Sequence, residues 1–440
     1  MKGLAGARVI IIDDERDEAL PILKELSKRG VPASYFDSQE DSLPKKDQRL
    51  PGVRLAIVDI DLVGGGISDK SKISTLLAYM CRIFVPDNGP YGILAWTKHG
   101  DLQQMFEEAL FKETLLPKPA FVVGLSKDSC KRDNGSFDLN IIAAKIDAAL
   151  GSFSPLLTLQ TWEEKCFWAA TQVTNQLASL AVQQATELGE WQMKLKDKFL
   201  QLLHAMAKAE AEQQLDADSC FAALYSSMNP LLADRMESNM ADLRKSLSVY
   251  SGEIMASTTA VDALARARLN TMLHLSIDSA NAFYAGNIYL QSTLCARVPS
   301  ATKLLRDLAD GKNPENQASI RAMASYVKPF MVEINATCDH AQNNIRIGRF
   351  LAGLIVPESD KKKIKKAEYI YQLGPVFLDS RMTPAGVYYL YFSARHLLTT
   401  DLKCAQGMHV FARLRAEAFA DLQAWFAHRA SRPGMLMLRD

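Results

Sequence analysis

Residues 8–15 read Arg-Val-Ile-Ile-Ile-Asp-Asp-Glu, an unbroken apolar run that stops at acidic residues. A continuous run of β-branched residues is typical of a strand buried on both faces, as in a parallel sheet covered by helices. Leucines at helical spacing follow in residues 16–29, and Gly30 marks the end of that helix. This stretch therefore predicts the first strand and the first helix of an α/β domain.

The same alternation continues to about residue 150. Further apolar runs, separated by polar or helical segments, predict strands at 33–36, 55–58, 92–96 and 121–125, and a closing helix at 138–150. Together with the first run, these segments predict a five-stranded, doubly wound parallel sheet in residues 1–150. The functional side chains of such sheets lie at the carboxyl ends of the strands.

Composition narrows the class of protein. The chain has 440 residues, of which 48% are hydrophobic, and this length predicts roughly two to four domains. The 51 Lys and Arg residues are balanced by 50 Asp and Glu residues, so the chain has almost no net positive charge that would attract nucleic acid. We therefore expect no nucleic-acid partner. Seven cysteines without a CxxC pair indicate reduced thiols. The first apolar run is too short for a signal peptide, and no run reaches the ~20 apolar residues of a membrane span. We therefore expect a cytoplasmic protein without a membrane partner, and not a secreted or disordered one.

Two further parts follow the α/β domain. Residues 151–326 predict a helical bundle domain, with helices over 158–213, 217–247, 256–290 and 297–310 that break at Pro230, Gly252 and Pro299. Residues 327–440 change to a period of two and predict a small, β-rich, barrel-like module. Its expected strands are 330–335, 350–356, 368–378 and 386–392, followed by a helix at 413–429 and a short strand from Gly434.

Polar side chains stand where the strands of the first domain end. Asp13 and Asp14 follow the first strand, Asp59 follows the third, Thr97 the fourth, and Lys127 the fifth. Because the carboxyl ends of parallel strands meet at one edge of a sheet, we expect these side chains to lie together. Three adjacent carboxylates remain ionised together only when a cation neutralises them, and Mg²⁺ prefers such oxygen ligands.

A carboxylate on a central strand can also attack a phosphoryl group, while a hydroxyl and an ammonium group bind the phosphoryl oxygens. Asp61 competes with Asp59 for the attacking role, but Asp59 ends the buried run directly and is the preferred candidate. Asp14, taken alone, is also explained as a helix N-cap.

This set of residues resembles the receiver domain of response regulators, over residues 1–150. The resemblance implies a flavodoxin-like fold, with Asp13 and Asp14 as metal ligands together with Asp59, and with Asp59 as the phosphoacceptor. Thr97 then matches the switch hydroxyl of the family and Lys127 its lysine. Pro44 and Pro51 depart from the family pattern, because they shorten or break the helix expected between the second and third strands.

The resemblance also implies partners and a cofactor. A sensor histidine kinase would donate the phosphoryl group, and Mg²⁺ would be the cofactor. The large extension without a DNA-binding motif resembles the divergent receivers of bacterial antiphage two-component systems of the Detocs type. That likeness implies a phosphate-buffering or regulatory receiver, with a sibling receiver-effector as a possible further partner, and no enzyme activity beyond the receiver's own phosphoryl chemistry.

Two alternatives remain from the residues themselves. Cys338, Asp339 and His340 bring a thiol, a carboxylate and an imidazole into adjacent positions, so the C-terminal module could be an effector that the receiver controls. The first domain could instead be a scaffold that is never phosphorylated. His204 is the nearest candidate for a phosphotransfer histidine, although a bundle histidine explains it better.

Overall fold

The computed structural model describes residues 8–62, 66–98, 102–151, 154–182, 191–211, 217–238, 252, 256, 260–277, 284–290, 299–309, 314–341, 345, 347–379, 382, 384–401 and 409–430. The chain divides into two compact units. The first comprises residues 1–195 and 229–258, and the second comprises 196–228 and 259–440. The helical segments are shared between these two units, so a separate central bundle stays a prediction.

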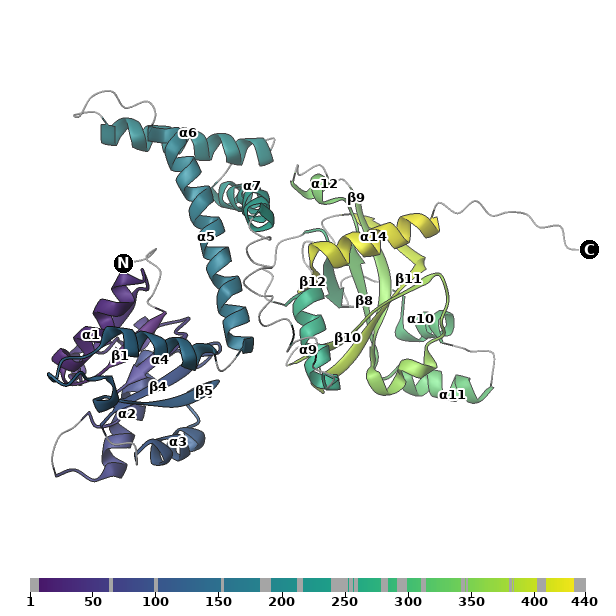
Figure 1. The fold of residues 1–440 in the computed structure, drawn as a ribbon. Coiled ribbons are helices and arrows are strands. Elements are labelled where there is room, and N and C mark those ends of the chain that lie inside the picture. The colour runs from purple at the N-terminus through teal and green to yellow at the C-terminus, as the bar shows by residue number, and fades with distance from the viewer. Residues whose placement is uncertain are drawn as a thin grey trace, which may run out of the picture. The chain divides into compact units, whose positions relative to one another are not determined.

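The first unit contains a parallel sheet (Figure 1), and the strand order of this sheet is β2-β1-β3-β4-β5. The five predicted strands are confirmed to within one residue at each end. They are β1 (Val9–Ile12), β2 (Ala33–Phe36), β3 (Leu55–Val58), β4 (Gly92–Thr97) and β5 (Phe121–Ser126). With helices on both faces, this arrangement suggests a flavodoxin-like fold.

Alternate residues of the strands pack against different helices. Ile10, on one face, shares a core with α2 (Asp69–Ile83) and α3 (Leu102–Lys112). Ile11, on the other face, shares a core with α1 (Arg16–Lys28) and α4 (Leu139–Gly151). Both isoleucines are fully buried, which explains why the strand reads as a continuous apolar run.

The connection from β2 to β3 lacks a regular helix. Its described residues contain only two short 3₁₀ turns, η1 (Glu40–Ser42) and η2 (Lys46–Gln48). The prediction that Pro44 and Pro51 break this helix is therefore confirmed. Both prolines lie beside these turns, where their fixed φ is tolerated and no helical N–H is required.

Three helices account for the described residues between 154 and 238: α5 (Ser154–Val182), α6 (Trp191–Ala211) and α7 (Ala217–Ser238). The prediction that Pro230 breaks a helix is wrong, because this residue lies inside α7. A proline removes one N–H donor and can bend a helix without ending it. The predicted continuation of α7 to residue 247 lies outside the described residues.

No single helix in the described ranges is both long and apolar enough to cross a membrane. Within the same ranges, one bent pair, Leu139–Gly151 and Pro155–Ala181, has the necessary length and composition when its two halves are taken together.

Helix α5 is attached to the parallel sheet by a carboxylate between two arginines. Glu163 accepts hydrogen bonds from Arg54 Nη2 at 2.5 Å and Arg54 Nε at 2.8 Å, and from Arg8 Nη2 at 2.7 Å. Arg8 and Arg54 directly precede β1 and β3. The paired guanidinium groups therefore bind α5 at the amino ends of these strands, opposite the edge where the polar residues gather.

The second unit contains a seven-stranded antiparallel sheet that curls into a half-barrel (Figure 1). The strand order is β10-β11-β9-β8-β7-β12-β6. The strands are β6 (Leu275–Ser276), β7 (Asn287–Leu290), β8 (Lys328–Glu333), β9 (Ile347–Pro357), β10 (Ile370–Leu378), β11 (Gly386–Asp401) and β12 (Val410–Leu414). The four predicted strands correspond to β8, β9, β10 and β11.

The predicted helix over residues 256–290 is wrong in its second half. Helix α9 (Ala263–His274) ends where β6 begins, and β7 follows at Asn287. The sheet therefore starts well before residue 327. Gly286 has a φ of +80°, which no helical residue adopts, and Ile288 and Tyr289 favour a strand.

Helices cover both faces of this sheet. Ile288 and Phe330 share a core with Phe419 of α14 (Ala416–Ala430). On the opposite face, α10 (Ala301–Leu308) and α11 (Pro314–Met323) pack against β9 and β11. The predicted C-terminal helix is thus present as α14, three residues later than expected, whereas the predicted strand from Gly434 lies outside the described residues.

Candidate functional site

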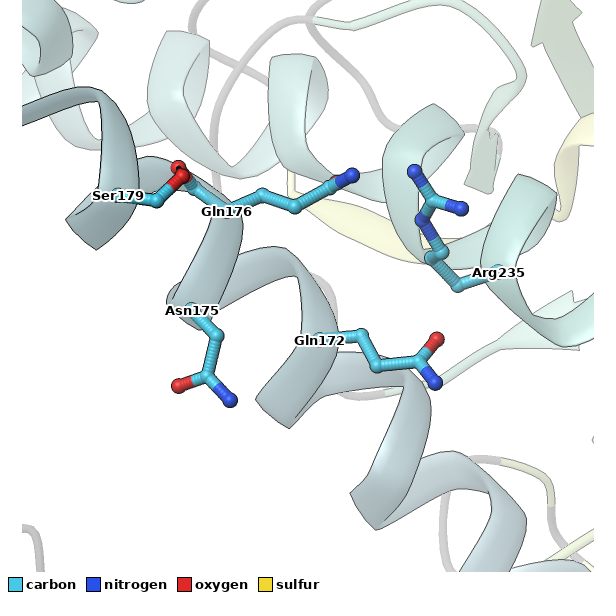
Figure 2. Close-up of a pocket in the computed structure, with 5 residues that line it drawn as sticks. All are labelled: Gln172, Asn175, Gln176, Ser179 and Arg235. Atoms are coloured by element: carbon cyan, nitrogen blue, oxygen red, sulfur yellow. Dashed lines mark hydrogen bonds between the residues drawn. The ribbon is translucent and has the colours of Figure 1, made fainter.

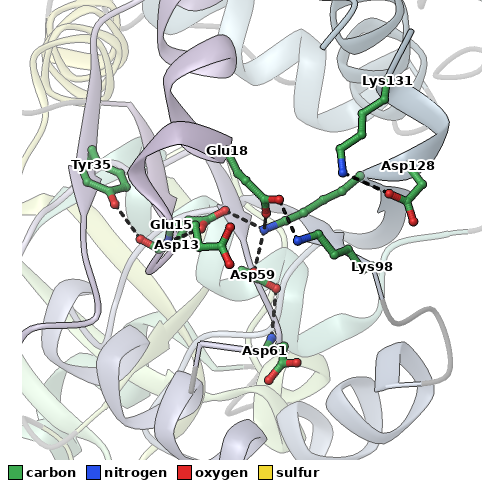
Figure 3. A network of polar contacts seen from close by, with 10 residues as sticks. Asp13, Glu15, Glu18, Tyr35, Asp59, Asp61, Lys98, Asp128 and Lys131 are labelled. Atoms are coloured by element: carbon green, nitrogen blue, oxygen red, sulfur yellow. Dashed lines mark hydrogen bonds and ion pairs between the residues drawn. The ribbon is translucent and has the colours of Figure 1, made fainter. Parts of the chain in front are cut away.

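The ends of β1, β3 and β5 bring acidic and basic side chains together (Figure 3). Ligand oxygens of Asp13, Asp14 and Asp59 all lie within 4.8 Å of one another. Asp13 is fully buried and Asp59 is 6% exposed, whereas Asp14 is exposed. The structure therefore brings together the three carboxylates that the sequence nominates as metal ligands.

Lys127 enters this cluster from the end of β5 and contacts three carboxylates. Its Nζ donates to Asp59 Oδ2 at 2.7 Å, to Asp13 Oδ2 at 3.0 Å and to Glu18 Oε2 at 2.5 Å. The Lys127 side chain is only 1% exposed. A buried ammonium group requires such partners, because an unpaired one would be very costly.

Backbone groups hold the two buried aspartates in place. The N–H of Glu15 donates to Asp13 Oδ1 at 2.8 Å, and the N–H of Asp61 donates to Asp59 Oδ1 at 3.0 Å. Tyr35 Oη donates to the carbonyl of Asp13 at 2.8 Å. Each aspartate thus has one oxygen fixed by the backbone and one directed toward Lys127.

Thr97 is the last residue of β4 and is 3% exposed. It pairs in register with Ser126, and its carbonyl accepts a hydrogen bond from the N–H of Lys127 at 3.1 Å. The strand register therefore places Thr97 and Lys127 at the same edge of the sheet. The Asp61 carboxylate pairs with Lys72 Nζ, at 2.6 Å, and not with Lys127.

Three groups of the cluster, Asp13, Asp14 and Lys127, have shifted pKa values. Burial, more than the neighbouring Asp59, raises the pKa of Asp13 to about 6, although Lys127 opposes this shift. Burial also raises the pKa of Asp14. The pKa of Lys127 is raised, because the charges of Asp59 and Asp13 outweigh the desolvation that would lower it. Asp13 and Asp14 therefore retain protons more tightly than usual, beside an ammonium group that stays charged.

The carboxylates fit a divalent cation such as Mg²⁺. Ligand oxygens of the three aspartates lie within 4.8 Å of one another, close enough together to serve one oxygen-coordinated cation. Counting Glu18 as well, four carboxylates face the ammonium groups of Lys127 and Lys98, which leaves an excess of two negative charges when all are ionised. A divalent cation would balance that excess, with Asp13, Asp14 and Asp59 as its ligands.

Sequence reasoning missed Glu18 and Lys98. Glu18 extends from α1 into the cluster, and its second carboxylate oxygen pairs with Lys98 Nζ at 2.7 Å (Figure 3). Although burial would raise the pKa of Glu18, the hydrogen bonds from Lys127 and Lys98 outweigh burial and lower it. A signal was present in the sequence: Glu18 shares the buried face of α1 with Ile22 and Leu26, four and eight residues further on.

The predicted C-terminal cluster is only partly described. His340 lies on α12 (Thr337–Ala341), and its Nε2 lies 2.7 Å from Glu333 Oε2. The His340 side chain is 3% exposed and that of Glu333 is fully buried. This buried pair attaches α12 to β8. The side chain of Cys338 lies outside the described residues, so the effector alternative stays a prediction. His204 is exposed on α6.

A separate hollow of about 370 Å³ lies against α5 and α7 (Figure 2). Gln172, Asn175, Gln176 and Ser179 of α5 line it together with Arg235 of α7. None of these side chains is a carboxylate, thiol or imidazole. The hollow therefore lacks the metal-binding and nucleophilic groups that the strand ends provide.

The sequence matches no known family model and no curated protein. The geometry of the strand-end cluster is therefore the basis for interpreting its chemistry.

Proposed function

We propose that residues 1–150 form a receiver domain that accepts a phosphoryl group on Asp59 in the presence of Mg²⁺. The observation that supports this proposal is the meeting of Asp13, Asp14 and Asp59 with the ammonium group of Lys127 at one edge of a parallel sheet. Metal-binding carboxylates and a buried cation beside a reactive carboxylate are the groups that phosphoryl transfer requires.

Each residue of the strand-end cluster has a separate role in the proposed phosphoryl transfer. Asp59 attacks the phosphorus atom of the donor, one new P–O bond forms, and the donor's leaving group departs with the electrons of the bond that breaks. Lys127 donates a hydrogen bond to a phosphoryl oxygen, since it already lies 2.7 Å from Asp59 Oδ2. Thr97, at the neighbouring strand end, supplies a hydroxyl. Mg²⁺ held by Asp13 and Asp14 would neutralise the phosphoryl charge.

Phosphoryl uptake tests this function directly. The full chain is incubated with Mg²⁺ and acetyl phosphate, and its mass is measured beside Asp59→Ala and Asp61→Asn. We expect one phosphoryl group on the wild type and on Asp61→Asn, and none on Asp59→Ala. The Asp61→Asn control removes a nearby carboxylate that pairs with Lys72 instead of Lys127. Absence of an adduct on the wild type, with no thermal stabilisation by beryllofluoride, would favour the scaffold alternative.

The cellular role that we propose is a regulatory or phosphate-buffering component of a bacterial antiphage two-component system, with a histidine kinase as donor. This role is supported by the resemblance of the sequence to the receivers of such systems. Kinase and protein are mixed with labelled ATP, and phosphoryl transfer to a sibling receiver-effector is followed. Buffering predicts that the wild type reduces labelling of the sibling, whereas Asp59→Ala does not. Equal labelling in both mixtures would contradict it.

A further inference from the structure

Glu18 joins the two lysines of the strand-end cluster. One of its carboxylate oxygens accepts from Lys127 Nζ at 2.5 Å, and the other pairs with Lys98 Nζ at 2.7 Å. The Glu18 side chain is 11% exposed, the Lys127 side chain 1%, and the Lys98 side chain 41%. Glu18 belongs to α1, whereas Lys98 directly follows β4 and Lys127 directly follows β5. One carboxylate therefore links three separate elements.

The three hydrogens of Lys127 are already in use. An ammonium group has three donors, and those of Lys127 face Asp13, Asp59 and Glu18. A phosphoryl oxygen that needs one of these donors must displace a carboxylate. Asp59 is the partner that gives way, because its oxygen loses its negative charge when it becomes an acyl phosphate.

The other two described partners of Lys127, Asp13 and Glu18, differ in whether they would also bind the metal. Asp13 belongs to the group of carboxylates that fit a cation, so its oxygens are shared between Lys127 and the metal. Glu18 lies outside that group, and in the proposed reaction it forms no bond to phosphorus. Among the carboxylates described around Lys127, it is therefore the partner that keeps its bond to the lysine throughout the reaction.

We infer that Glu18 is a positioning residue for phosphoryl transfer to Asp59: it holds the ammonium group of Lys127 toward the phosphoryl oxygens, and Lys98 holds Glu18. This inference rests on the proposed function, because it assigns Glu18 a role in that reaction. Without Glu18, the described side chains that hold Lys127 are two aspartates, which the metal and the phosphoryl group would engage.

The test is a double-mutant cycle on the full chain. Phosphoryl uptake from acetyl phosphate at saturating Mg²⁺ is measured by intact mass for the wild type, Glu18→Gln, Lys127→Met and the double variant. We expect Glu18→Gln to slow uptake about tenfold, as losses of supporting partners commonly do. In the Lys127→Met background the same change should have no further effect, because the group that Glu18 positions is gone.

A matched control uses the same substitution on the same helix. Glu25 of α1 pairs with Arg29 at 3.0 Å, away from the cluster, and Glu25→Gln should leave uptake within twofold of the wild type. A second readout needs neither metal nor activity. Lys127 Nζ lies 6.0 Å from the centre of the Trp96 ring, so the Trp96 indole resonance of the metal-free protein should shift in Glu18→Gln and not in Glu25→Gln.

The outcomes separate the two proposals. Suppose that the wild type takes up the phosphoryl group. If Glu18→Gln then leaves the rate of uptake unchanged, or slows it equally in the wild-type and Lys127→Met backgrounds, the role of Glu18 is overturned and the receiver function stays in place. Absence of uptake by the wild type overturns both. If Glu18→Gln does not fold, Lys98→Met replaces it in the cycle. The inference is supported if Lys98→Met slows uptake in the wild-type background and has no effect in the Lys127→Met background. It is overturned if Lys98→Met leaves the rate of uptake unchanged.

Discussion

At the scale of single residues, burial of like charges is the dominant feature of the strand-end cluster. Asp13 and Asp59 are almost inaccessible, yet both lie beside other carboxylates. Lys127 compensates for part of this charge, because it contacts both aspartates. The remaining negative charge destabilises the folded protein, and the cation that we propose would relieve it, so stability and metal affinity would be coupled here.

This coupling predicts a dependence of Mg²⁺ binding on pH. Burial raises the pKa of Asp13 from its ordinary value of 3.8 to about 6. The folded, metal-free protein therefore holds a proton that the unfolded chain releases, and its stability falls as the pH rises from about 4 to about 6. A metal requires the deprotonated carboxylate, so Mg²⁺ affinity should fall about tenfold per pH unit below 6.

Thermal shift measures this effect: the increase in Tm on adding Mg²⁺ should be larger at pH 7.5 than at pH 5. Asp13→Asn should remove most of the response at both values, because a neutral amide cannot supply a charged ligand. An increase that is equal at the two pH values, or one that survives in Asp13→Asn, would exclude Asp13 as the group that controls metal binding.

The limits of sequence reasoning are also visible in single residues. Asp13, Asp14, Asp59, Thr97 and Lys127 could be nominated because strand ends converge in any parallel sheet. Glu18 could not be found this way, because it lies on α1; Lys98 directly follows β4, as Lys127 follows β5, but was not nominated. The apolar spacing of α1 places Glu18 on the buried face of that helix, but only the tertiary structure reveals that Glu18 and Lys98 pair with each other in the cluster.

At the scale of secondary structure, prediction succeeded where patterns are continuous. The apolar runs of β1, β3 and β4 are buried on both faces and could be read directly. The four residues of β7 were missed, because a short strand between helical segments carries too little periodic signal. Gly286 is the local reason why the chain turns into that strand.

Gly286 therefore provides a test of the second sheet. Its φ is +80°, and a Cβ placed there would lie 3.3 Å from the carbonyl oxygen of Leu414 and from the ring of Phe419. Gly286→Ala adds a crowded methyl group to an unfavourable backbone, and we expect the unfolding transition of the second unit to lose about 1–3 kcal/mol.

Gly135→Ala is the matched control. Gly135 has a similar φ of +78°, but no atom lies within 4 Å of the position of its Cβ. The alanine there meets backbone strain alone, so the loss should be smaller and confined to the first unit. Chemical denaturation followed by hydrogen exchange distinguishes the units, and equal losses at both positions would show that crowding at Gly286 is unimportant.

At the scale of the whole molecule, the chain divides into two compact units, whereas composition and periodicity predict three domains. The predicted boundary at residue 150 coincides with the end of α4, where the alternation of strands and helices stops. Periodicity cannot detect that α5 belongs with the parallel sheet, because the attachment consists of one carboxylate and two arginines that are more than 100 residues away in sequence.

This attachment predicts where proteases will cut. Glu163 binds both Arg8 and Arg54, and its pKa is lowered chiefly by the hydrogen bond from Arg54. Its ionised form therefore stabilises the folded state above the ordinary pKa of 4.5, and that stabilisation is lost as the pH falls through the lowered value. At neutral pH, limited proteolysis of the full chain should leave an N-terminal fragment that includes α5.

Glu163→Gln should weaken the attachment, because a neutral amide accepts from guanidinium groups less strongly than a carboxylate does. Mass spectrometry of the digests should then show earlier cleavage within α5 and a fragment that ends near residue 151. Glu164→Gln, one position along the same helix, should digest like the wild type. A wild-type fragment that already ends near residue 151 would mean that α5 is not held by Arg8 and Arg54. The domain boundary would then follow the alternation of strands and helices, as the sequence alone predicts.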